Sequence, residues 1–238
     1  AGGLTSMVLE ADGHIGGRAH TEIMPDGAPF DLGCHWMHSA SLNPFVETAD
    51  ELGVQYERRE GYGRSAFFRN DRWLNDAEVA AGVQAMEKRE AAVATAWSQG
   101  KDRSVLETVE RKDSWTEYLD YLDTLNTSSD VDQISIGDLV SYKDTGENWP
   151  VVDGYGTLVS RWGADVPVSL NTVATAVSWG ASGVTVETNK GKIQATCTVI
   201  TVSTDVLGSG NIRFEPELPL EKQAAIAALP LGNYNRIR

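Results

Sequence analysis

The sequence has only two cysteines among its 238 residues, Cys34 and Cys197, and they lie far apart without a CxxC spacing. A disulfide framework or a thiolate metal site needs more cysteines or closer ones, so neither is predicted. All four histidines fall within the first forty residues, and none belongs to an HExxH pair. This distribution argues against a metal centre. No internal repeat or low-complexity tract occurs.

Basic residues are also scarce, with 20 Lys and Arg against 34 Asp and Glu and a formal net charge of −14. This deficit argues against nucleic acid as a partner, because a phosphate backbone is held by basic side chains in excess. An acidic balance attracts cationic substrates over long range, but we favour the simpler interpretation that it keeps a cytoplasmic protein soluble. The oligomeric state is left open.

No run of 18 or more apolar residues is present, so no membrane span is predicted. There is no charged-then-apolar leader either, and Ala1 resembles a truncation point rather than a natural start. With 41% hydrophobic residues, the chain can bury a substantial core in one or two domains. Because helix and strand patterns both occur, a mixed α/β fold is expected.

Cap and turn residues divide the chain into predicted elements. Residues 44–52 are expected to form a helix that is capped by Asn43 and ended by Gly53. Further helices are predicted at 76–98, 114–125, 154–162 and 221–229. Strands are predicted at 6–10, 166–170, 174–179, 184–188 and 192–202. The last three strands form a meander, and its final apolar run, 199–202, is typical of a strand buried in a parallel sheet.

A dinucleotide site at the start of a Rossmann unit needs a glycine-rich turn, a helix N-terminus facing the phosphates, and an acidic residue that binds the ribose. Glu10 closes the first predicted strand and is the candidate for that acid. Gly3 looks like the third glycine of a GxGxxG element, but only six residues separate it from Glu10. About twenty are usual, because a helix and most of a strand fit between them. We therefore expect that a segment is missing here.

Four stretches of the sequence carry motifs in a recognisable order. They read VLEADGHIGGRAHTE (8–22), FDLGCHWMHSASLNP (30–44), YKDTGENWPVVDGYGTLVSRWGADVPVSLNT (142–172) and TVITVSTDVLGSGNIRFEPELPLEKQAAIAALPLGNYNRI (198–237). Together they resemble the flavin amine oxidases, a group that includes polyamine, monoamine and L-amino-acid oxidases. The resemblance runs from end to end and is weakest across the helical middle.

This resemblance implies FAD as the cofactor and assigns residues to its two ends. Glu10 would hold the adenosine ribose, and Gly3 would belong to the glycine turn. Ala174 takes a position whose backbone contacts adenine in relatives, which usually carry valine there. Towards the flavin, Gly16 and Gly17 would let the backbone pass close to the cofactor. Arg18 would pair with the pyrophosphate–ribityl region, which suits a planar guanidinium.

The segment of Gly33, Cys34, His35 and Trp36 would pass near the isoalloxazine ring. His38 matches a substrate-facing polar residue of the polyamine-oxidase-like members, so it is the catalytic candidate. A neutral imidazole there would hydrogen-bond the amine or shuttle a proton. The alternative is a histidine bonded only within the protein, and for His35 that structural interpretation is favoured. Cys34 is interpreted as a small packing residue rather than a covalent flavin anchor, because the family's covalent cysteine lies near the C-terminus.

The sequence also departs from the family pattern. Ser203 stands where a proline is usual, and Arg236 where a lysine is usual. The lysine that bridges through water to flavin N5, and the C-terminal flavin segment, would lie beyond Arg238. We therefore expect this chain to lack the first strand with its glycine turn and helix, the N5 lysine and the C-terminal flavin clamp. By itself it is expected to bind FAD poorly and to be inactive.

The fold implied is a Rossmann-like, glutathione-reductase-type FAD domain with a β-meander, joined to a mostly helical substrate-side domain. Residues 1–40 and 150–205 would build the discontinuous FAD domain. Residues 41–149 would form the helical insertion, and 206–238 would begin the substrate-domain sheet.

The function implied is oxidation of a small-molecule amine to an imine. A hydride passes to the flavin, and molecular oxygen reoxidises it and yields hydrogen peroxide. Two alternatives are another oxidoreductase of the same fold, such as a desaturase or porphyrinogen oxidase, and a non-catalytic truncated homologue. The D-x-G-x-x-W-x-H and N-W-x-V segments favour the amine oxidases.

Overall fold

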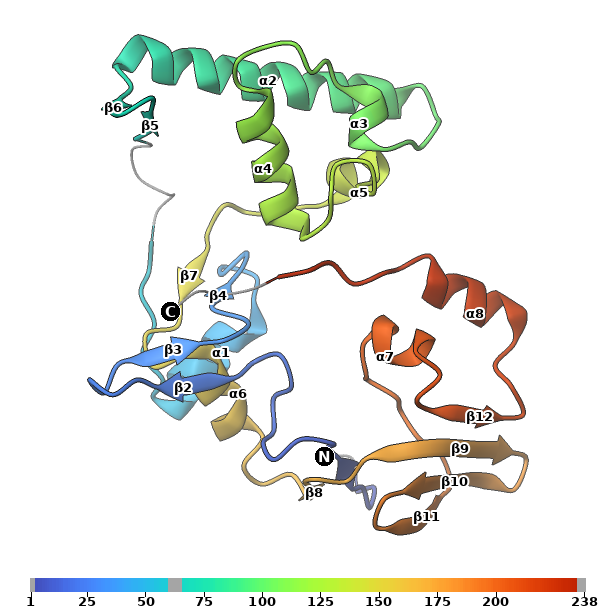
Figure 1. Cartoon of the computed structure of the whole chain (residues 1–238). Coiled ribbons are helices and arrows are strands. Elements are labelled where there is room, and N and C mark those ends of the chain that lie inside the picture. The colour runs from blue at the N-terminus through green and yellow to red at the C-terminus, as the bar shows by residue number, and fades with distance from the viewer. Residues whose placement is uncertain (1–2, 60–65, 235–238) are drawn as a thin grey trace.

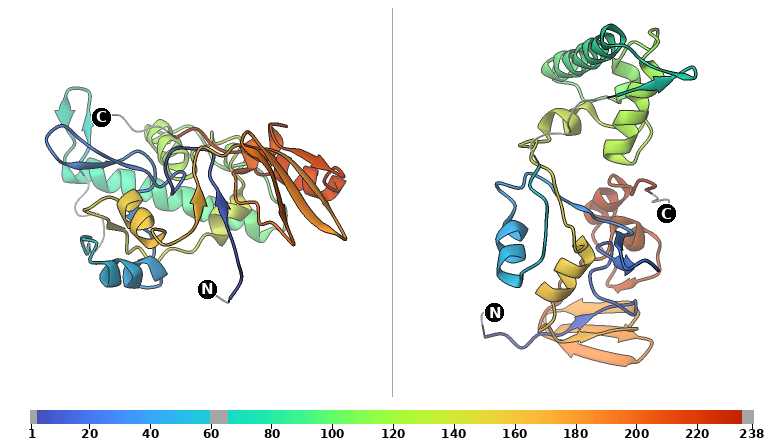
Figure 2. Two further views of the ribbon diagram at one scale, coloured as in Figure 1. Left: turned by 90° about the horizontal axis from the view of Figure 1, so that it is seen from below. Right: turned by 90° about the vertical axis from the view of Figure 1, so that its left-hand side faces the viewer.

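The computed structural model describes residues 3–59 and 66–234. Figure 1 shows the helices α2 to α5 and the β5–β6 hairpin gathered in one lobe, with the remaining elements below it. The segment between α5 and β7 leads from the helical lobe into the lower part, and Figure 2 shows the same separation from a second side. Strands and helices both build the lower part, so the expected mixed α/β character is confirmed.

The helical lobe is organised by its longest helix, α2 (Asp76–Ser98), which follows the hairpin of β5 (Phe68–Arg69) and β6 (Arg72–Trp73). Asn75 and Glu78 close a reciprocal capping box at its start, which satisfies backbone N–H groups that have no partner inside the helix. The short helices α3 (Val105–Thr108) and α5 (Ile136–Ser141) lie beside α2. Their shared core contains Val93, Ala96, Val105, Ile134 and Ile136.

An ion-pair network joins α2 to α4 (Thr116–Thr127). The Arg89 guanidinium is only 8% exposed, and it donates to the carboxylates of Asp120 and Asp123 at 2.8 Å each. Burial raises the pKa of Asp123, although the charge of Arg89 opposes that effect. A buried guanidinium is tolerated here because two carboxylates compensate it.

The lower part has its own apolar core beneath a short antiparallel pair, β4 (Trp36–Met37) and β7 (Trp149–Pro150). The helices α1 (Pro44–Leu52) and α6 (Tyr155–Trp162) pack on this pair. Their core consists of Met37, Ala49, Val54, Val151 and Leu158. Burial of these side chains holds the loop between β3 and β4, which carries the predicted site residues Gly33, Cys34 and His35.

Two further strand pairs flank this core. The hairpin of β2 (Thr21–Ile23) and β3 (Pro29–Asp31) is antiparallel. The strand β1 (Val8–Leu9) runs parallel to β8 (Val168–Ser169), so the N-terminal strand meets a segment about 160 residues later in the sequence. Glu10 directly follows β1, and its N–H donates to the Ser169 carbonyl at 3.0 Å.

The C-terminal sheet has the strand order β11-β10-β9-β12. The predicted meander is present as β9 (Ala174–Gly180), β10 (Gly183–Thr188) and β11 (Gly191–Ala195), paired antiparallel in succession. A fourth strand, β12 (Arg213–Glu215), adds parallel to β9. The helices α7 (Thr204–Gly208) and α8 (Leu220–Ala227) pack against each other beside β12.

The predicted helices at 44–52 and 76–98 are confirmed with the same bounds. The expected strand continuation through 199–202 is wrong, because β11 ends at Ala195 and Val199 is 85% exposed. No strand within residues 3–59 and 66–234 pairs with that run, so its backbone lacks the hydrogen bonds that a sheet would supply. Within the segment 206–238, expected to begin the substrate-domain sheet, β12 pairs with β9 of the meander.

The predicted helical insertion, 41–149, includes α1, which packs on α6 in the lower part rather than in the helical lobe. The division into domains stays a prediction. Of the helices in the described ranges, none is both long and apolar enough to cross a membrane.

Candidate functional site

One buried carboxylate, that of Asp31 at the end of β3, joins several segments of the lower part, and this residue is 3% exposed. Its Oδ1 accepts from the Thr21 hydroxyl at 2.5 Å and from the Gly156 N–H at 3.4 Å. Its Oδ2 interacts with His35 Nδ1 at 3.0 Å and accepts from the Tyr155 N–H at 3.1 Å. Asp31 thus joins β2, the β3–β4 loop and the N-terminus of α6.

The start of α6 explains why an acid is placed here. The first backbone N–H groups of a helix have no partner inside the helix, and the helix dipole favours a negative charge at that end. Asp31 takes the N–H groups of Tyr155 and Gly156, and the Thr21 hydroxyl oxygen accepts the next one, from Thr157, at 3.2 Å. Asp31 and Thr21 therefore cap a helix from a distant hairpin.

The protonation state of Asp31 follows from these contacts. Burial raises the pKa of the Asp31 carboxyl. Hydrogen bonds from His35, Thr21 and the two α6 N–H groups lower this pKa by more than burial raises it, so it lies below its usual value. The carboxylate is therefore ionised at neutral pH and acts only as an acceptor. A buried charge is stable here because four donors replace its hydration.

Directly after Asp31, the chain makes a close turn against the loop that carries Arg18. The Leu32 N–H donates to the His20 carbonyl at 2.9 Å, and the Cys34 N–H donates to the Arg18 carbonyl at 3.2 Å. Between them, a Cβ on Gly33 would overlap the Arg18 carbonyl oxygen. Only glycine permits this approach, so the structure brings Gly33, Cys34 and Arg18 together as one unit.

The preceding loop needs glycine for a different reason. Gly16 has φ +100°, and a Cβ there would come within 2.5 Å of the Ala19 carbonyl oxygen. Gly17 has φ +54°, also in the left-handed region. This conformation presents Arg18 on the surface, and no described side chain or carbonyl pairs with its guanidinium. An exposed, uncompensated guanidinium suits a phosphate ligand.

Glu10 and Ala174 are brought near one another. The Thr172 N–H donates to the Glu10 carbonyl at 2.8 Å, and Ala174 begins β9 two residues later. The Glu10 carboxylate itself accepts from the Asp12 N–H at 2.8 Å, so it also orders its own turn. Gly3 has φ +72°, and a Cβ there would meet no atom within 4 Å, so the structure shows no close approach that requires it.

His38 is exposed and directly follows β4, opposite the segment that leads into β7. Its Nδ1 interacts with Oδ1 of Asn148 at 2.5 Å, and Asn148 is only 5% exposed. The Asn148 amide in turn donates to Asp144 at 3.5 Å. The Gly146 N–H holds the pKa of Asp144 below its usual value, and Asn148, Ser39 and His38 contribute to the same lowering. His38 is therefore oriented by a buried amide and a carboxylate.

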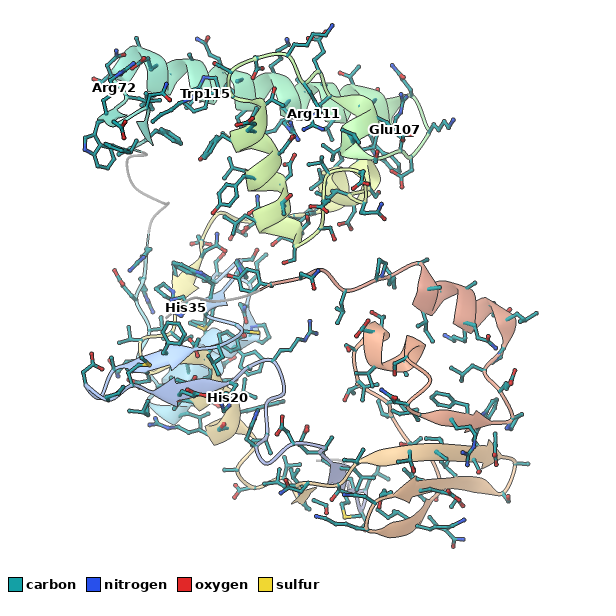
Figure 3. All side chains as sticks on the ribbon, in the orientation of Figure 1. His20, His35, Arg72, Glu107, Arg111 and Trp115 are labelled. Carbon is teal, nitrogen blue, oxygen red and sulfur yellow. The ribbon has the colours of Figure 1, made fainter. Side chains whose placement is uncertain are left out.

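Aromatic and cationic side chains contact the tryptophans of β4 and β7, Trp36 and Trp149. His35 lies edge-on to Trp36, with 5.1 Å between ring centroids, and Figure 3 shows His35 in the lower part near β4. The Arg59 guanidinium lies 5.6 Å from the centre of the Trp36 ring. Trp149 of β7 stacks on Tyr56 and has Arg58 5.2 Å from its centre. These contacts restrict the rings next to His38.

Both cysteines are free and exposed. Within residues 3–59 and 66–234, no three His, Cys, Asp or Glu side chains gather as a set that could hold a metal ion.

A family model described as flavin containing amine oxidoreductase matches residues 1–133 and 114–238, which together cover the whole chain. The chain belongs to this family. The predicted resemblance is thereby confirmed, and flavin is the cofactor of the family.

Curated relatives extend this result. Polyamine oxidase 4 of Oryza sativa subsp. japonica is 27% identical over 262 residues, which cover 97% of this chain and 53% of the relative. Lysine-specific histone demethylase 1 homolog 3 of the same plant is 25% identical over 259 residues, with 99% of this chain and 32% of the relative covered. The chain thus spans about half the length of the polyamine oxidases that it matches.

Solved structures show the same fold. Cyclohexylamine oxidase from Brevibacterium oxydans IH-35A has a TM-score of 0.70 and 19% identity, covering 94% of this chain and 58% of its own. A putrescine oxidase redesigned in its cofactor binding has a TM-score of 0.69 and 19% identity, covering 97% and 59%. At this identity the likeness concerns the fold alone.

Sequence reasoning named the residues on either side of Asp31 but missed Asp31 itself, together with Thr21, Asn148 and Asp144. A signal existed for two of these residues, because Asp31 is the acid of the D-x-G motif and Asn148 the amide of the N-W-x-V motif. The pairing of Asp31 with α6, 124 residues later, could not be read from the sequence.

We expect Asp31→Asn to lower the free energy of unfolding by about 2–4 kcal/mol at pH 7, because an amide cannot accept from all four donors. Since folding lowers the pKa of Asp31, its contribution is present above the unfolded pKa of about 3.9 and is lost as pH falls through the folded value. Urea unfolding of parent and variant from pH 7 to pH 3 should therefore show a difference that shrinks only below about pH 4. Asp26→Asn, at the exposed turn of the same hairpin, is the control and should cost less than about 1 kcal/mol.

A second prediction concerns the close turn. Gly33→Ala should destabilise the chain by about 1–3 kcal/mol, because the added methyl group displaces the Arg18 carbonyl. Gly180→Ala is the matched control: its Cβ meets no atom within 4 Å, and its φ is not positive. Chemical denaturation of the three proteins checks the prediction, and equal stability of both variants would contradict it.

Proposed function

We propose that this chain forms the flavin-facing and substrate-facing part of an oxidase that converts a small-molecule amine into an imine. The observation that carries the proposal is that the Arg18 loop, the turn at Gly33 and His38 lie next to one another in the structure. The turn at Gly33 packs against the Arg18 carbonyl, and His38 lies directly after β4, five residues beyond Gly33. The segments that the family resemblance assigns to flavin and to substrate are thus adjacent on one framework fixed by Asp31.

The residues present fit a flavin nucleotide. Arg18 offers an exposed guanidinium, to which no residue of 3–59 or 66–234 is bonded, beside two glycines that leave the backbone open. Glu10 offers a carboxylate just after a strand and beside the start of β9. We assign Arg18 to the pyrophosphate region and Glu10 to the adenosine ribose. Gly16, Gly17 and the Gly33–Trp36 segment would lie along the remainder of the cofactor, and the Ala174 backbone beside the adenine.

The flavin, when bound, would accept the hydride from the carbon next to the amine nitrogen and pass the electrons on to molecular oxygen. His38 would act on the substrate nitrogen. A hydride leaves readily only from a neutral amine, so the substrate must first lose the ammonium proton. His38 is exposed and carries Asn148 at Nδ1, which leaves Nε2 to accept that proton or to orient the amine.

Asn148 and Asp144 would support this role of His38. A glutamine or asparagine amide has a donor side and an acceptor side. Because Asp144 is an acceptor, the Asn148 NH₂ group points to it, and the amide oxygen is left for His38. The proton of a neutral His38 then lies on Nδ1, and the imidazole keeps one orientation.

For the adenosine end, Glu10→Gln should weaken FAD retention by about 1–3 kcal/mol, the cost of losing a charge-assisted hydrogen bond. Turnover at saturating FAD should change little. The measurement is flavin content after dialysis, made on the chain extended with the flanking segments of the rice polyamine oxidase. Glu221→Gln, on α8, is the control. If Glu10→Gln keeps its flavin as well as the parent does, Glu10 serves only to order the turn at Asp12.

For the substrate end, His38→Ala should reduce amine oxidation by roughly 10²–10⁴-fold if proton transfer limits the rate, with flavin content unchanged. The measurement is the rate of anaerobic flavin reduction by mono-, di- and polyamines and by an N-methyl-lysine peptide, on the same extended protein. His35→Ala is the contrast, and it should act through stability or flavin binding instead. A parental reduction rate of His38→Ala with every substrate would show that His38 is structural.

A further inference from the structure

His35 is bonded differently from the other histidines of the chain. Its Nδ1 lies 3.0 Å from the buried Asp31 carboxylate, whereas His14 and His20 lie 3.7 and 3.9 Å from carboxylates that are exposed to solvent. The His35 ring also lies edge-on to Trp36, which prevents free rotation. Among the described residues, no group hydrogen-bonds its Nε2, and the side chain is 32% exposed.

The partners of Asp31 decide where the His35 proton lies. The carboxylate accepts from Thr21 and from two α6 N–H groups, and it has no proton to give. An unprotonated Nδ1 would turn its lone pair towards the lone pairs of a carboxylate oxygen at 3.0 Å, which is repulsive. Nδ1 must therefore carry a proton in both the neutral and the charged imidazole. A free imidazole prefers the opposite neutral form, with its proton on Nε2.

We propose that Asp31 is a positioning residue for a ligand contact made by His35. It holds the proton of the neutral imidazole on Nδ1 and leaves Nε2 as a hydrogen-bond acceptor on the accessible side of the β4 edge. The ligand group that suits this atom is an O–H or N–H donor, such as a ribityl hydroxyl or a ring N–H of the flavin. The identity of this ligand rests on the proposed function, whereas the position of the proton does not.

The test is the tautomer of His35 in the 238-residue chain. Long-range ¹H–¹⁵N spectra of ¹⁵N-histidine-labelled protein distinguish a protonated ring nitrogen from an unprotonated one. Spectra are recorded from pH 6 to pH 10, so that the neutral form is reached, and His35→Gln assigns the signals. The expected result is a protonated Nδ1 and an unprotonated Nε2 at high pH. A neutral His35 with its proton on Nε2 would overturn the proposal without any variant.

Asp31→Ala then tests the cause. Because alanine leaves Nδ1 without an acceptor, the neutral His35 of this variant should shift to the form protonated on Nε2, which a free imidazole prefers. Asparagine is not used, because its amide oxygen could still accept from both Nδ1 and the Tyr155 N–H. Asp12→Ala, beside His14, is the control and should leave the His35 signals unchanged. A folded Asp31→Ala variant that keeps the proton on Nδ1 would show that Asp31 does not position it. If Asp31→Ala does not fold, Thr21→Val is used, which removes one donor but keeps the carboxylate and should keep the Nδ1-protonated form; a shift of the proton to Nε2 in that variant would overturn the proposal.

A failure of the proposed function can be distinguished from a failure of the His35 proposal. An extended protein that takes up no flavin would contradict the assigned function and leave the His35 tautomer as stated. If flavin is bound, His35→Gln, whose side-chain oxygen can take the place of Nε2, should retain it better than His35→Asn. The expected difference is roughly threefold to tenfold in Kd, the range for one hydrogen bond. Equal retention by the two variants would overturn the ligand contact.

Discussion

One buried carboxylate fixes the part of the molecule on which its chemistry depends. Asp31 gathers a hydroxyl from β2, an imidazole from the loop before β4, and two N–H groups from the start of α6. Removing a charge from water is costly, and these four donors offset that cost only if all are in place. The arrangement is therefore cooperative, because a shift of any one element leaves the charge under-compensated. This is why loops with little regular structure keep a defined geometry here.

The candidate site follows from that constraint. The turn after Asp31 passes so close to the Arg18 carbonyl that only Gly33 fits, and this contact sets where the Gly16–Arg18 loop lies. On the other side, the buried Met37 anchors β4 and leaves His38 at the edge, held by Asn148. The same frame thus serves the segments assigned to cofactor and to substrate. The chain belongs to the flavin-containing amine oxidoreductases, and for this reason we assign these segments to a flavin and an amine.

Local signals in the sequence predicted local structure well. Asn43 with Pro44 and Gly53 define α1, and the capping box at Asn75 defines the start of α2, because caps act within one turn of a helix. The apolar run at 199–202 gave a wrong prediction, because apolar character does not supply a pairing partner. The candidate site residues are predictions from motifs. The contacts of Asp31 with α6 and of His38 with Asn148 join segments more than 100 residues apart and leave no local pattern in the sequence.

The central claim is that the frame around Asp31 presents Arg18 and the β3–β4 loop to a flavin nucleotide. A crystal structure of the chain, extended with the flanking segments of a polyamine oxidase and bound to FAD, tests it most directly. The account predicts the Arg18 guanidinium within hydrogen-bonding distance of the pyrophosphate or ribityl group, with the four contacts of Asp31 intact. A flavin bound away from Arg18 and the Gly33–Trp36 segment would contradict it.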